Sequence, residues 1–187
     1  YKHWNKLPLS RQLAFIDLIR RSMERHQFPA DGRDLVLAML TQHFPNGSSA
    51  INRALAPLLI KLTPHTAVPQ TIALLDADIH QQEGLFYLYH LRHARAGWTP
   101  DLRRTFFRIL GTYETFLGGR GLPLAFKNIR REALETLTAE EKKQYAGFIS
   151  QKPLLPPMPD LTGRGQVRQW KVSDFEGKLG FDASERN

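Results

Sequence analysis

Two histidines are the side chains whose spacing comes nearest to a metal site. His90 and His93 are one helical turn apart, and His80 or Glu83 precedes them on the same expected helix. Imidazoles and carboxylates on one helix face are ligands that zinc accepts. A set of three ligands at an established spacing is missing, however, and no HExxH motif occurs. Since histidines at a core edge are commoner than ligands, we expect no metal site and no cofactor.

A glycine-rich stretch, Gly118-Gly119-Arg120-Gly121, precedes another expected helix. Backbone amides at a helix N-terminus can hold a phosphate. A P-loop follows a strand and carries a lysine, and this stretch does neither. We interpret it as a flexible connection between two helices.

No residue pattern supplies an obvious nucleophile. The sequence contains no cysteine, which excludes disulfides, thiolate metal sites and covalent haem attachment within the chain. No serine lies in a GxSxG elbow. Paired carboxylates such as Glu140 and Glu141 lie at expected helix starts, where they complement the helix dipole. We therefore favour a non-enzymatic role for this chain.

The 187 residues carry a formal net charge of +8, which predicts attraction to polyanions or acidic partners. The basic residues are spread along the chain in pairs and triplets. On amphipathic helices such groups usually form a solvated face. The alternative is a surface that binds an anion or a partner, for which the candidates are Arg103, Arg104, Arg108, Arg130 and Arg131.

The stretch Gly97-Trp98-Thr99-Pro100 has the residue order of a helix start. Thr99 can accept a hydrogen bond from a free amide, and Pro100 suits the first helical position. Trp98 is expected to be largely buried, where it would staple the incoming chain near Leu102 or Arg103. The functional alternative for Trp98 is an exposed aromatic ring that receives a partner.

Apolar residues recur with helical spacing from the N-terminus to about residue 149, and strand-like alternation is nearly absent. Thr138 with Glu141, and Asp78 with Gln81, have the spacing of capping boxes. Pro57 is expected to bend its helix, and Pro69 to lie in a first turn. The predicted helices cover about 10–26, 33–44, 49–63, 67–76, 79–95, 100–117, 123–136 and 139–149.

These helices can be paired as about four antiparallel hairpins that begin near residues 10, 49, 79 and 123. A hairpin cannot bury its apolar faces alone, so neighbours share one core. The predicted fold class is therefore all-α, an irregular α-solenoid of the HEAT or armadillo kind. We expect a helical-repeat domain over 1–149, followed over 150–187 by a Pro-rich strap and a last short helix near Ser173–Glu176.

No apolar run reaches the roughly 20 residues that span a bilayer, so we expect no membrane insertion. The first residue is Tyr1 rather than Met, which is typical of a fragment or a processed form. The sequence itself is compatible with a cytoplasmic or an exported protein.

Residues from about 51 to 137 resemble a helical region of large exported haem-binding CxxCH proteins of planctomycetes and related bacteria. The resemblance is carried by INRALAPLL, by LYHLRHARAGWTPDLRR and by FLGGRGLPLAFKNIRREAL. The segment Val167-Arg168-Gln169-Trp170 also resembles the approach to the cytochrome c domain of those proteins. The resemblance implies a periplasmic or exported protein whose partners are adjoining domains, including a c-type cytochrome domain. CxxCH itself is absent from this sequence, so no catalytic residue is carried over.

Together these observations predict a non-catalytic helical-repeat scaffold or docking domain of a larger exported redox protein. The alternative is a basic HEAT-like nucleic-acid-binding protein similar to DNA glycosylases of that architecture, whose concave face follows phosphates. Clustering of the arginines on one surface favours the alternative, and scattered arginines favour the scaffold. In the scaffold interpretation, binding to nucleic acid is weak and non-specific.

Overall fold

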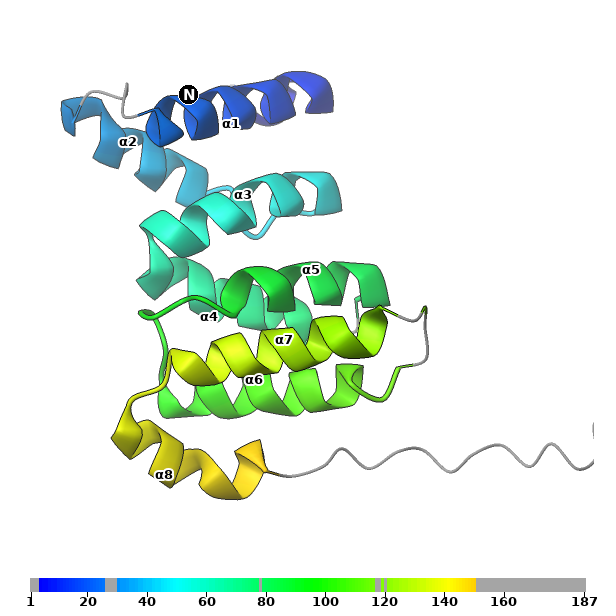
Figure 1. Cartoon of the computed structure of the whole chain (residues 1–187). Coiled ribbons are helices and arrows are strands. Elements are labelled where there is room, and N and C mark those ends of the chain that lie inside the picture. The colour runs from blue at the N-terminus through cyan, green and yellow to red at the C-terminus, as the bar shows by residue number, and fades with distance from the viewer. Residues whose placement is uncertain (1–3, 26–29, 78, 117–118, 120, 151–187) are drawn as a thin grey trace, which may run out of the picture. The chain divides into compact units, whose positions relative to one another are not determined.

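A computed structural model describes residues 4–25, 30–77, 79–116, 119 and 121–150 of the chain (Figure 1). The chain divides into two units, Tyr1–Leu154 and Leu155–Asn187, and the described residues all belong to the first. The expected Pro-rich strap and last short helix therefore lie outside the described residues. The helices are η1 (Trp4–Lys6, a 3₁₀ turn), α1 (Leu9–Glu24), α2 (Ala30–Thr41), α3 (Ser49–Leu62), α4 (Pro64–Leu75), α5 (Gln81–Leu91), α6 (Pro100–Tyr113), α7 (Leu122–Glu135) and α8 (Ala139–Ile149).

The all-helical class predicted from apolar periodicity is confirmed, because the described residues form helices and no strand. Each predicted helix corresponds to an observed one. The predicted ends differ most for α5, which ends at Leu91 instead of near residue 95, and for α6, which ends at Tyr113 instead of near residue 117. α2 begins and ends three residues earlier than predicted, at Ala30 and Thr41. Pro45 disfavours helical backbone at Phe44, so α2 cannot continue through this position.

Two helix starts that the sequence predicts are confirmed at the level of hydrogen bonds. The Thr99 hydroxyl accepts from the Leu102 amide at 3.3 Å, with Pro100 at the first helical position of α6. Thr138 and Glu141 form a reciprocal capping box at α8, with distances of 2.8 and 3.1 Å. Asp78 lies outside the described residues, and the N-cap of α5 is His80, whose side chain makes no capping bond.

One proline, Pro69, lies deeper inside its helix than the sequence predicts. Pro69 was predicted in a first turn, but α4 already begins at Pro64, so Pro69 is an interior residue. That prediction was wrong because Pro64, next to Thr63, supplies the helix start that suits proline. Pro57 lies within α3, which continues to Leu62. That it bends α3 remains a prediction.

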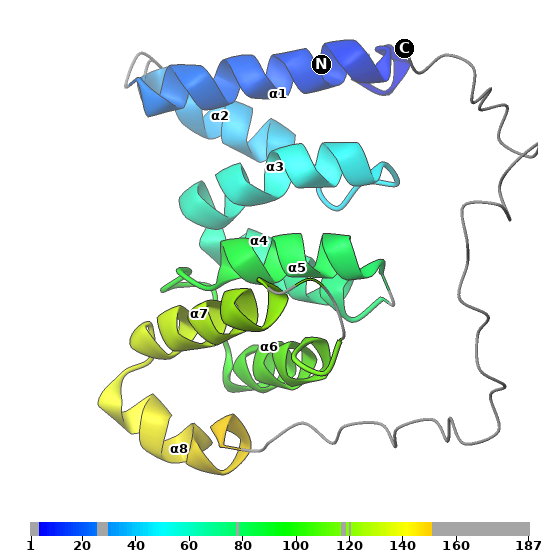
Figure 2. The same cartoon turned by 45° about the vertical axis from the view of Figure 1, so that its right-hand side comes forward.

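The helices of this unit pack in two stacks (Figures 1 and 2). In one, α1 packs on α3, α3 on α5 and α5 on α7; in the other, α4 packs on α6 and α6 on α8. Contacts of α3 with α4, α4 with α5 and α5 with α6 join the two. The odd-numbered helices run in the same direction, so the C-terminal ends of α1, α3 and α5 lie at one side of the unit.

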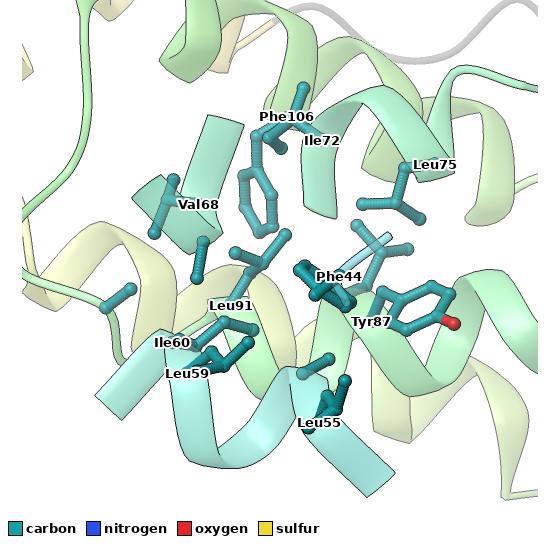
Figure 3. Close-up of a cluster of buried hydrophobic side chains, with 14 of the residues drawn as sticks. Phe44, Leu55, Leu59, Ile60, Val68, Ile72, Leu75, Tyr87, Leu91 and Phe106 are labelled. Carbon is teal, nitrogen blue, oxygen red and sulfur yellow. The ribbon is translucent and has the colours of Figure 1, made fainter. Parts of the chain in front are cut away.

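The centre of the unit is a continuous apolar core (Figure 3). Side chains from α3, α4, α5 and α6 converge there with Phe44, which precedes α3. Burial of such apolar area is the main favourable term in folding, at roughly 25 cal/mol per Å². The largest fully buried members include Tyr87, Phe106, Leu55, Leu59, Leu88 and Leu91.

Candidate functional site

The stretch Gly97-Trp98-Thr99-Pro100 forms the end of the turn between α5 and α6 and the first residue of α6. Gly97 has φ +82°, a conformation that side chains disfavour, and a Cβ there would lie 2.1 Å from the Pro64 carbonyl oxygen. The turn thus packs directly on the start of α4. Gly97 is required by this close approach, and its role is structural.

Trp98 lies over the first turns of α6, as the motif predicted. Its ring contacts Phe106 edge-on, with centroids 5.5 Å apart, and its indole N–H donates to the Ala94 carbonyl at 2.7 Å. The side chain is half-buried rather than largely buried, which corrects the expectation. One face of the indole is covered by Arg103, whose Cζ lies 4.2 Å from the ring centroid.

Arg103 does not belong to any surface. It is 2% exposed, so its inclusion among surface arginines was wrong. Its Nη1 donates to the Thr136 hydroxyl at 3.1 Å, while Nε is buried with no hydrogen-bond partner in the described part of the chain. Burial lowers the pKa of Arg103 to about 10, against a weaker opposing effect of Glu141.

Several other arginines join helices that are distant in sequence. Arg130 on α7 donates to both carboxylate oxygens of Glu114, at 2.6 and 2.7 Å, and this pair is only 19% and 18% exposed. Arg108 on α6 reaches Asp76 at the end of α4, at 2.6 Å. Each guanidinium is therefore occupied by a carboxylate of another segment.

The same use of arginine recurs between α3, α5 and α7. Arg53 on α3 pairs with Glu83 on α5 at 3.0 Å. Arg92, just after α5, donates to Glu132 on α7. That hydrogen bond is the main cause of the lowered pKa of Glu132. The pairing forms a series of cross-links along the unit.

Arg104 and Arg131 keep the exposure expected of surface residues. Arg104 pairs with Asp101 one turn earlier on α6, at 2.8 Å. Arg131 contacts Glu132 at 3.4 Å and Glu135 at 3.9 Å. Arg130 and Arg131 line one hollow of about 380 Å³ with Lys127 and Lys142. The five predicted arginines are thus not brought to one surface.

His90 and His93, which the sequence paired, line a common hollow of about 420 Å³. His93 lies in the turn after α5 and its Nε2 is 3.3 Å from Glu132. Burial lowers the pKa of His90, and the nearby Arg92 and Arg53 act in the same direction. Among the described residues no group of three or more His, Asp or Glu side chains could hold a metal ion.

The hollow beside the histidines adjoins a second one across α3. The second, of about 330 Å³, lies between α1, α2 and α3. Pro57 and Lys61, one turn apart on α3, line both hollows. We call these two residues the α3 ridge. Leu58 and Leu62 face the second hollow, and Ile60 and Pro64 face the first.

Three cations around the α3 ridge escaped the sequence analysis. Arg33 lines the hollow on one side, Arg95 the hollow on the other, and Lys61 both. All three are exposed, and none makes an ion pair with a carboxylate of the described residues. None of them belongs to the basic pairs and triplets from which the candidate surface was predicted. No sequence signal connects them, because only folding brings them together.

In the described residues no helix is long and apolar enough to cross a membrane. No family model, no curated protein and no solved structure matches the chain.

Proposed function

We propose that this chain is a non-catalytic helical-repeat scaffold, a docking domain of a larger exported redox protein. Its architecture is an irregular α-solenoid of helical hairpins in the manner of HEAT or armadillo repeats. Its task is to hold adjoining domains, among them a c-type cytochrome domain, in a fixed relation.

The observation that carries this proposal is the use of the arginines as cross-links between helices. Arg53, Arg92, Arg108 and Arg130 each pair with a carboxylate on a different segment. Breaking a buried ion pair is strongly destabilising, so the two mostly buried pairs, Arg92 with Glu132 and Arg130 with Glu114, favour one relative position of the helices that they join. A stack whose neighbouring helices are cross-linked resists bending, which is what a spacer between domains requires.

The order of helix contacts supports a repeat architecture. Each odd-numbered helix packs on the next odd-numbered one, from α1 to α7, and α4, α6 and α8 follow the same rule. In repeat proteins each unit contacts only its neighbours along the sequence. The exported redox context rests on the resemblance alone.

The nucleic-acid-binding alternative needs arginines gathered on one face and free to neutralise phosphates. Arg103 is buried, and Arg104, Arg108, Arg130 and Arg131 are each engaged by carboxylates. This distribution favours the scaffold. Binding of the chain to duplex DNA is expected to be weak and to decline steeply as salt is raised.

Two measurements test the proposal. The gene, read beyond the codon for Asn187, is expected to encode a CxxCH haem site in the same reading frame. The purified chain is expected to retain neither haem nor zinc after chelation, as judged by an absorbance scan and metal analysis. A stoichiometric metal that survives chelation would overturn the expectation that the chain holds no metal, and a downstream reading frame without CxxCH would overturn the redox context.

A further inference from the structure

The chemistry of the α3 ridge and its two hollows goes beyond a general docking role. The hollows have volumes of about 330 and 420 Å³. Their floors are formed by apolar side chains, among them Met23, Leu58 and Leu62 on one side and Ile60 and Ala94 on the other. A surface of this kind accepts apolar side chains on both sides of a central crossing point.

The charges around the ridge are unbalanced. Arg33, Lys61 and Arg95 have no carboxylate partner among the described residues. Glu24 is the single carboxylate among the described lining residues, and it is bonded to Arg20 at 2.8 Å. A local excess of cations without carboxylate partners is a place where external negative charge can bind.

We infer that the α3 ridge binds an acidic, extended peptide segment of a partner protein, which crosses α3 at Pro57 and Lys61 and places apolar side chains in the two hollows. The inference rests on the proposed docking function and names its surface and the chemistry of its partner. Carboxylates of the segment meet Lys61 at the crossing and Arg33 and Arg95 at the two rims. An extended polyproline II segment has three residues per turn, so acidic and apolar residues at neighbouring positions form adjacent rows that can both contact the surface.

The floors argue for a peptide over a nucleic acid. A nucleic-acid site combines cations with aromatic side chains on which bases stack. The described lining residues of both hollows include no Phe, Tyr or Trp, and the aromatic rings among them are the imidazoles of His90 and His93 in one hollow. Burial of leucine-like side chains against apolar floors contributes favourable binding free energy, whereas phosphates contribute none there.

The test uses the full chain and a fluorescein-labelled peptide of repeated Glu-Leu-Pro, in which proline favours an extended backbone. Fluorescence anisotropy at low and at physiological salt measures its affinity. Lys61→Glu is expected to weaken binding by about tenfold or more, since it converts attraction at the crossing point into repulsion. Arg33→Glu and Arg95→Glu are expected to weaken it as well.

Lys143→Glu is the matched control, because Lys143 is an exposed lysine on α8 outside both hollows. It makes the same change in net charge and is expected to leave the affinity nearly unaltered. Circular dichroism and thermal unfolding of each variant establish that the fold is kept. Equal losses in Lys61→Glu and Lys143→Glu overturn the inference, because binding then follows net charge alone.

Two further probes decide the class of partner. A Glu-Gly-Pro peptide of equal charge is expected to bind more weakly than the Glu-Leu-Pro peptide, and equal affinity overturns the role of the apolar floors. Duplex DNA that binds more tightly and displaces the peptide also overturns the inference. Haem and zinc content, measured on the same preparation, tests the non-catalytic function separately, so the two failures remain distinguishable.

Discussion

The Cζ atom of Arg103 lies over the indole ring of Trp98, 4.2 Å from the ring centroid, and the two residues together join the α5–α6 turn to the segment after α7. Trp98 is held by its own hydrogen bond to Ala94. Arg103 reaches Thr136 on the other side. A cation stacked on tryptophan in a site removed from water gains up to about 2 kcal/mol, which offsets part of the cost of its burial.

Trp98→Ala is expected to lower the free energy of unfolding by about 2–3 kcal/mol, measured by urea denaturation. Fully buried tryptophans cost more when truncated, and Trp98 is half-buried. Trp98→Phe keeps an aromatic ring over Arg103 and should lose much less stability than Trp98→Ala. Unchanged unfolding of Trp98→Ala would show that the residue is no staple and would favour a role in binding.

Arg103→Met is expected to leave stability unchanged or to raise it by about 1 kcal/mol. An apolar side chain of similar length removes a buried charge whose Nε has no partner among the described residues. Arg103→Ala is expected to cost about 2 kcal/mol or more, because it also leaves a cavity under the indole. Equal destabilisation by both substitutions would mean that the guanidinium itself is needed.

Glu114→Gln is expected to cost about 2–3 kcal/mol, since it leaves the half-buried Arg130 without its carboxylate. The control is Glu24→Gln in the ion pair with Arg20, where the side chains are 53% and 40% exposed. Exposed pairs contribute little, so this change should stay within about 0.5 kcal/mol. Similar losses at both sites would contradict the cross-linking role of Arg130.

Stability is expected to fall as the pH drops below about 6.5, the ordinary pKa of histidine. Burial lowers the pKa of both His43 and His90 in the folded chain. The unfolded chain then binds more protons between the lowered and the ordinary pKa, so stability is lost over that window on acidification. Urea unfolding of the His43→Gln, His90→Gln double variant should show a weaker dependence on pH than the His65→Gln control.

Gly84→Ala is expected to destabilise the fold by about 1–3 kcal/mol. Its Cβ would lie 1.8 Å from the Tyr113 hydroxyl oxygen, in the buried contact between α5 and α6. Gly147 on α8 has no atom within 4 Å of such a Cβ, so Gly147→Ala should stabilise by about 0.5–1 kcal/mol. Thermal unfolding compares the two, and a stabilising Gly84→Ala would contradict the close packing.

The helices could be predicted from the sequence because their signals are local. Thr99 with Pro100, and Thr138 with Glu141, mark helix starts within a few residues, and apolar spacing marks the faces that become buried. Where the expectation failed, a competing local signal existed. α4 begins at Pro64, so Pro69 is not in its first turn. α5 ends at Leu91, so His93 lies in the turn that follows it.

The partners and the burial of the arginines could not be predicted from such local signals. Arg130 meets Glu114 16 positions away, and Arg92 meets Glu132 40 positions away. Nothing in the spacing of Arg103 distinguishes it from its exposed neighbour Arg104, and only the packing of α6 beneath Trp98 buries it. Arg33, Lys61 and Arg95 come together for the same reason, through the packing of helices on α3.

Gly97 couples the lengths of two turns that lie far apart in the chain. Its backbone passes so close to the Pro64 carbonyl that neither turn can shift or lengthen without displacing the other. Insertions during evolution should therefore be excluded from both turns at once and tolerated elsewhere. In any set of homologous chains this glycine should be invariant, and the close approach of two backbones is sufficient to explain such conservation without an active site.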